Sequence, residues 1–273
     1  MKKMLLIISV LLLSANGLYA QEPEQKFHGF NLQGYNDEGE MTWEVNGDTA
    51  DIIGSEIILS NVDANTFGKD KMNVVAKIGI VDQISGKMHL EEDVVITSES
   101  GQKLITDSLD WNRNEDLVTT QDDVMITGDK MIVTGTGMRA QPGLKLAKIK
   151  KDVTVIIDIE QDEKGGSKKL TITSDGPMVI NQLKSIATFD DNVVAYQDDQ
   201  TLKADHMEIY FDEGMSGIQK MVCTGNVEIE QGENKSYAEK VVYIAATKKL
   251  ILSGRPKLIL LIEGGGLFAA SGD

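Results

Sequence analysis

The sequence predicts an all-β protein made of stacked repeats of about 30 residues. Short apolar runs recur along the chain, as in Val94–Thr97, and Val227–Glu230 alternates strictly between apolar and charged residues. Gly, Asp and Asn separate these runs, which is typical of strands joined by turns. The runs also return at a regular spacing, and this regularity indicates a repeat architecture.

Each repeat begins with an acid, an amide or a turn residue followed by a strand. A second strand follows a polar turn, as at Leu104–Trp111 and Leu202–Tyr210, and a third, weaker strand leads into the next repeat. Such a unit cannot bury its own apolar face, so neighbouring units must stack into an elongated sandwich or groove with open ends. The repeats start at Asp93-Val94, Asp123-Val124, Asp152-Val153, Asn192-Val193, Asn226-Val227 and Pro256-Lys257-Leu258, with spacings of 30, 29, 40, 34 and 30 residues.

The first 20 residues are interpreted as a signal peptide. Lys2 and Lys3 precede the apolar run Met4–Ala15, and Asn16–Ala20 then ends on a small residue. This run is shorter than the roughly 20 apolar residues that a membrane-spanning helix needs. An uncleaved membrane anchor is the alternative, because Leu18 is not ideal three positions before the cut.

The charge and the single cysteine exclude several classes of site. The formal net charge is −16, and it becomes −18 when the first 20 residues are removed, because they hold two lysines and no acids. Such acidity argues against binding of nucleic acid or of an anionic membrane surface. Cys223 is the only cysteine, so an internal disulfide and a four-cysteine metal site are excluded, and we expect Cys223 to be a small buried side chain.

No pattern of residues indicates catalysis or a cofactor, and we expect neither an enzyme nor a resident metal. His28, His89 and His206 are scattered without the spacing of metal ligands. Four acidic clusters are expected at solvated turns, with calcium binding as the alternative. These clusters are Glu91–Asp93, Asp122–Asp123, Asp190–Asp191 and Asp198–Asp199.

Several motifs resemble the lipopolysaccharide-export bridge proteins LptC and LptA. Leu202–Tyr210, followed by Cys223–Ile229, is similar to the repeat of the OstA-like fold found in LptA. Thr42–Gly47 and Leu109–Trp111 resemble strands of LptC. Gly135–Ala140 resembles the glycine-methionine turn that closes LptC domains.

This resemblance implies a twisted, partly open β-jellyroll. It divides the chain after the signal peptide into an LptC-like region (21–160), a polar insert or linker (161–169) and an LptA/OstA-like region (170–273). It further implies a periplasmic protein that holds the acyl chains of lipopolysaccharide in an apolar groove. The implied partners are other jellyroll proteins, paired edge to edge, and the inner-membrane ABC transporter complex, with the final unit from Leu258 as a docking edge.

The inward-facing apolar residues of the strands are the candidates for this groove. Alternate residues of a strand face the same side of a sheet, so each run contributes one apolar row. The competing interpretation is that the same row forms an ordinary core. The candidates are Val94, Ile96, Leu109, Trp111, Val124, Ile126, Val133, Val153, Val155, Val227, Ile229 and Val241.

Two other exported architectures are compatible with the repeats. A β-solenoid used as a scaffold or surface protein would also repeat, but it would have no lipid ligand. A polysaccharide-cleaving β-helix would need basic residues beside the acidic turns, and the sequence lacks them there. The repeat therefore predicts the fold class more firmly than the ligand.

Overall fold

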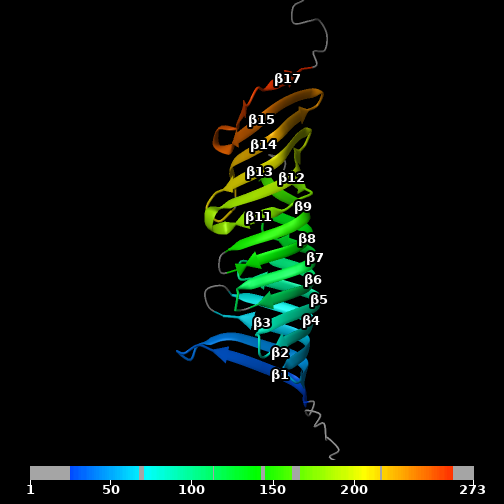
Figure 1. Ribbon diagram of the computed structural model, residues 1–273. Helices are drawn as coiled ribbons and strands as arrows, with labels where there is room; N and C mark the ends of the chain where they lie inside the picture. The colour runs from blue at the N-terminus through cyan, green and yellow to red at the C-terminus, as the bar shows by residue number, and fades with distance from the viewer. Residues whose placement is uncertain are drawn as a thin grey trace, which may run out of the picture.

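The computed structural model describes residues 25–67, 71–112, 114–142, 145–161, 167–215 and 217–260. The predicted signal peptide, residues 1–20, lies outside this part, as do residues 162–166 of the predicted polar insert. Over the described ranges the chain forms 17 strands that stack along one axis, from β1 at one end to β17 at the other (Figure 1). The all-β class predicted from the sequence is confirmed.

The strands follow one another in chain order. The first nine are β1 (Gln25–Tyr35), β2 (Met41–Ile53), β3 (Glu56–Thr66), β4 (Met72–Asp82), β5 (Lys87–Ser98), β6 (Lys103–Asn112), β7 (Leu117–Thr127), β8 (Met131–Gln141) and β9 (Leu146–Gln161). The others are β10 (Ser167–Ser174), β11 (Met178–Asn181), β12 (Ile186–Gln197), β13 (Gln200–Phe211), β14 (Ile218–Gln231), β15 (Asn234–Ile244), β16 (Lys249–Ser253) and β17 (Lys257–Ile259). Two 3-10 turns, η2 (Gln182–Lys184) and η3 (Ala245–Thr247), follow β11 and β15.

Every pairing in the sheet is antiparallel, and the strands form a continuous meander. The short strands β10 and β11 share one position between β9 and β12, and β16 and β17 both pair with β15. No helix in the described part is long and apolar enough to cross a membrane.

Most long strands bend once near the middle, at a β-bulge. The register shifts at this point in the pairs from β4/β5 to β8/β9 and from β12/β13 to β14/β15. In β5 the bend lies at Glu92 and Asp93, with φ of 61° and 56°, and in β12 it lies at Asp191 and Asn192, with φ of 63° and 53°. Asp and Asn enter this left-handed region more readily than most residues, because their short polar side chains form local hydrogen bonds. A bulge bends its strand and increases the twist.

Because the bends lie side by side, the sheet folds over itself into two walls. Strands β5 and β6, for example, pair Leu90 with Leu109 on one side of the bend and Ile96 with Leu104 on the other. The inward row of the first wall contains Leu90, Leu109, Met138, Ile149, Met178, Phe189, Met207, Cys223 and Val241. The inward row of the second wall contains Val74, Ile96, Leu104, Ile126, Val133, Val155, Ile172, Ala195 and Leu202.

One hydrophobic core runs between the two walls from Val74 to Val241. A smaller cluster centred on Leu59 lies under the N-terminal strands. Cys223 is 1% exposed within the main core, which confirms the prediction for this residue. Burial raises the pKa of its thiol to about 12, so the native thiol stays protonated.

The number of strands in a repeat was predicted incorrectly. The third, weaker strand expected in one repeat and the first strand of the next form a single bent strand, as in Leu117–Thr127. Gly135–Ala140, expected to form a turn, instead lies inside β8, where Gly137 adopts φ 69°. A repeat therefore consists of two long bent strands.

The positions of the acidic clusters also differ from those expected. Asp198–Asp199 does form a hairpin turn, as predicted. Glu91–Asp93, Asp122–Asp123 and Asp190–Asp191 lie at the bends inside strands. The same residue types that favour turns also tolerate the left-handed backbone of a bulge, so the two settings look alike in the sequence.

Candidate functional site

An open apolar groove lies between the two walls, over β4 to β9 and reaching β11. Its volume is about 810 Å³. The apolar side chains that line it come from six consecutive strands and from β11. They are Met72, Val74, Leu90, Ile96, Leu104, Leu109, Trp111, Val118, Ile126, Met138, Ala140, Leu146, Ala147 and Ile180.

In β5 and β7, inward residues of the second wall become more exposed with distance from the bend. Val94 directly follows the bend of β5 and is fully buried, whereas Ile96, two residues farther along, is half-buried and lines the groove. Val124 and Ile126 repeat this relation in β7. Near the bend the walls are close enough for their side chains to interdigitate. Farther away the walls diverge, and an open apolar surface remains between them.

Polar residues form two lips along the groove. Lys71, Ser98 and Glu99 lie at the open edge of the second wall, where the Lys71 Nζ is 3.0 Å from the Glu99 Oε1. Asp116 and Lys145 lie at the edge of the first wall. A deep apolar surface with polar groups at its border suits an amphipathic ligand, whose hydrocarbon enters while its polar part stays at the lips.

The structure divides the predicted groove residues into three groups. Ile96, Leu109, Trp111 and Ile126 line the groove. Ile229 is half-buried in β14 and packs against the core. The valines pack in the core between the walls: Val94, Val124, Val133, Val153, Val155, Val227 and Val241.

Sequence reasoning missed the lining residues of the weaker strands, such as Leu90 and Val118. The inward row continues across each bend, but the number of residues between successive inward side chains changes there. This change in spacing is the signal in the sequence that could have identified the missed lining residues. In β5 the row passes from Leu90 to Val94, a step of four residues, and in β6 from Thr106 to Leu109, a step of three. The odd step in β6 breaks a strict two-residue period, whereas in β5 the period is kept and the exposed Glu92 interrupts the apolar row.

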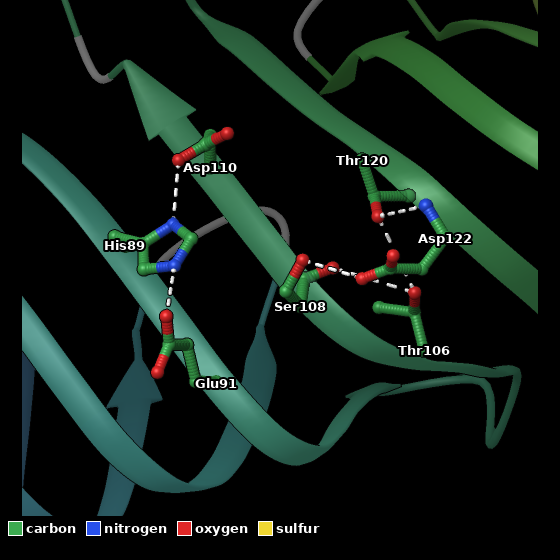
Figure 2. Close-up of polar contacts among 7 residues, drawn as sticks. All are labelled: His89, Glu91, Thr106, Ser108, Asp110, Thr120 and Asp122. Atoms are coloured by element: carbon green, nitrogen blue, oxygen red, sulfur yellow. Dashed lines mark hydrogen bonds and ion pairs between the residues drawn. The ribbon is translucent and has the colours of Figure 1, made fainter.

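The bends of β6 and β7 carry hydrogen-bonded polar residues (Figure 2). Ser108 donates a hydrogen bond from its Oγ to the Asp122 Oδ2 at 2.5 Å, and the backbone N–H of Asp122 donates to the Thr120 Oγ1 at 3.1 Å. The Oγ1 atoms of Thr106 and Thr120, both buried, are 3.5 Å apart. The Ser108–Asp122 and Thr106–Thr120 contacts join β6 to β7 where the ladder of backbone pairs is interrupted.

His89 lies on the outer face of the first wall, between two carboxylates. Its Nδ1 is 2.7 Å from the Asp110 Oδ1 on β6, and its Nε2 is 2.8 Å from the Glu91 Oε1 (Figure 2). Partial burial lowers the pKa of His89, but the hydrogen bonds and charges of Asp110 and Glu91 outweigh this effect and raise the pKa above 6.5.

The described residues contain no group of three or more side chains suited to a metal ion.

His206 repeats the arrangement of His89 in the second half of the chain. Its Nδ1 is 2.6 Å from the Asp190 Oδ1 on the neighbouring strand β12, and its Nε2 is 3.8 Å from the Glu208 Oε1. Both histidines join adjacent strands on the outside of the sheet, on the face opposite the groove. Because each histidine contacts a carboxylate on the adjacent strand, we assign both histidines a role in stabilising strand pairing.

We predict that replacing His89 makes stability depend less on pH. Because its folded-state pKa is raised, the stabilisation is fully present below the unfolded pKa of about 6.5 and is lost as the pH rises through the folded-state pKa. His89→Gln should therefore lower the melting temperature more at about pH 6 than at about pH 8.5. His28→Gln, on the exposed strand β1, is the matched control. An equal loss at both pH values would contradict the prediction.

Comparison with known families gives two matches that together cover most of the chain. The family model described as lipopolysaccharide-assembly, LptC-related, matches residues 6–158. The model described as LptA/(LptD N-terminal domain) LPS transport protein matches residues 171–266. A search of curated proteins gave no match. The first match contains β1 to β8 and most of the groove, and the second contains β11 to β17.

Proposed function

The chain belongs to the LptC-related family of lipopolysaccharide-assembly proteins, and from this premise we propose that its groove holds the acyl chains of lipopolysaccharide. The second half is similar to LptA and the N-terminal domain of LptD. Both family assignments predicted from the sequence are thereby confirmed. These families are periplasmic, non-enzymatic bridge proteins, and the chain is a component of lipopolysaccharide transport.

The apolar groove is the observation that carries the proposal. Burying hydrocarbon releases about 0.8 kcal/mol for each CH₂ group, so a long acyl chain gains its affinity from contact with the lining. The net charge of −16 opposes general attraction of an anionic lipid, and this leaves apolar burial as the main source of binding. The polar lips let the headgroup remain in water while the chains are covered.

Exposed strand edges support pairing with other jellyrolls. In the described part of the chain β17 pairs with β15 alone, and Leu258 and Ile259 are 62% and 42% exposed. An unpaired edge offers backbone groups and alternating side chains to an added strand. At the other end β1 pairs with β2. These two edges are suited to neighbouring bridge proteins and to the inner-membrane ABC transporter complex.

A periplasmic location under this proposal is supported by the N-terminal residues. Residues 1–20 carry the pattern of a signal peptide, and they lie outside the described residues. Cleavage would release a periplasmic chain, while retention of the same segment would tether the protein to the inner membrane. In either case the groove works outside the cytoplasm, where lipopolysaccharide crosses to the outer membrane.

Photocrosslinking in living cells tests lipid binding. A crosslinker at Ile126, which lines the groove, is predicted to capture lipopolysaccharide. The adjacent Met125, 38% exposed on the outside of the same strand, is the matched control. Its adduct should be about tenfold weaker, because neighbouring strand residues face opposite sides of the sheet. Equal adducts at both positions, or none at Ile126 and Ile96, would contradict the proposal.

Removing the last described strand tests edge pairing. Deletion of residues 257–273 is predicted to weaken co-purification with a second jellyroll protein of the bridge, because β17 supplies the outward edge. Ile84→Ser removes an 86% exposed side chain at the β4–β5 turn and serves as the control for loss of surface hydrophobicity. Unchanged association after the deletion would rule out this edge as the docking surface.

A further inference from the structure

The boundary between the two family matches lies inside one continuous sheet. Strand β9 pairs with β8 on one side, within the LptC-like half. On its other side β9 forms eight residue pairs with β10 and four with β11, which leads into the LptA-like half. The two halves are therefore joined by the same kind of backbone ladder that joins strands within each half.

The core is also continuous across this joint. Ile149 and Val155 of β9 belong to the same cluster as Ile172 and Met178 of the following strands, and each of these four side chains is at most 2% exposed. Separating the halves would expose these side chains to water and leave the edge of β9 unpaired. Both effects oppose separation.

The groove itself crosses the joint. Ala140, Ala147 and Ile180 are aligned across β8, β9 and β11, since Ala140 pairs with Ala147 and Ala147 pairs with Ile180. All three side chains line the groove. The two alanines fill little space, and this keeps the groove open at the point where the LptC-like half meets the LptA-like half.

We infer that a single acyl-chain site spans this joint, so that lipid passes from the LptC-like half to the LptA-like half within one undissociated chain. The inference rests on the proposed function, and it adds a specific location and a specific set of residues. Where two separate bridge proteins would meet through edges that associate and dissociate, this chain has a permanent connection. Ala147 then determines whether an acyl chain fits through the crossing point.

Proteolysis in the absence of lipid tests whether the joint between the two halves is permanent. A site for a specific protease replaces residues 162–166, between β9 and β10, and the purified full-length protein is then cut. We expect the two fragments to elute together in native buffer and to separate only in denaturant. Separation in native buffer would overturn the inference of a permanent joint, whatever the protein binds.

The site at the joint is tested by photocrosslinking at Ile180 in cells. Lipopolysaccharide adducts are expected both at Ile180 and at Ile96, which lies farther from the joint in the same groove. Ala147→Leu should lower the Ile180 adduct about tenfold by filling the crossing point, while the Ile96 adduct persists. Lys148→Leu is the matched control, because Lys148 is the exposed neighbour on the outer face.

The pattern of adducts distinguishes failure of the shared site at the joint from failure of lipid binding. An adduct at Ile96 without one at Ile180 in the unsubstituted chain would overturn the shared site and leave lipid binding intact. The absence of adducts at both positions would contradict lipid binding itself. An Ile180 adduct that Ala147→Leu leaves unchanged, in a protein with an unaltered melting temperature, would remove Ala147 from the path of the lipid.

Discussion

The bend in each strand is the constraint on which the rest of the structure depends. In β5, β9, β12 and β14 the bend places a residue other than glycine in the left-handed region, which costs most residues roughly 1–2 kcal/mol. Amide side chains at two of these bends offset the cost by hydrogen bonding to a carboxylate on the preceding strand or turn. Asn226 donates from its Nδ2 to the Asp205 Oδ2 at 2.8 Å, and Asn192 donates in the same way to the Asp175 Oδ2 at 3.0 Å. The repeated acid and amide residues thus keep the bends in line along the stack.

The core and the groove both follow from this line of bends. Beside the bend the two walls meet, and residues such as Val94 and Val153 become fully buried. Away from it the walls diverge, and Ile96 and Ile126 border an open apolar surface. In β5 and β7 the residue beside the bend packs in the core and the residue two positions farther lines the groove, while Leu90, Leu109 and Met138 belong to both. The single thiol, at Cys223, is buried in the core, so the fold depends on packing and backbone pairing.

Much of this architecture could be predicted from the sequence, and the failures have physical causes. The alternation and the spacing of the repeats predicted the strands, and short motifs predicted both families. Alternation shows which way a side chain points but not how far the opposite wall lies, so Val94 and Ile96 looked equivalent. The acids at Asp190–Asp191 were assigned to a turn because a turn and a bulge both favour residues that accept the left-handed backbone seen at Asp191. Ala140 and Ala147 carried no signal, because a small residue fits a core as well as a groove.

Entry of acyl chains between the two walls is the central claim, and Trp111 reports on it directly. Trp111 lines the groove, and Trp43→Phe leaves it as the only tryptophan. In this variant, titration with purified lipopolysaccharide is predicted to shift the Trp111 emission to shorter wavelength in a saturable manner, because hydrocarbon replaces water around the indole. Deacylated lipopolysaccharide should produce no such shift. An unchanged spectrum on titration with the acylated form, or an equal shift with the deacylated form, would contradict the claim.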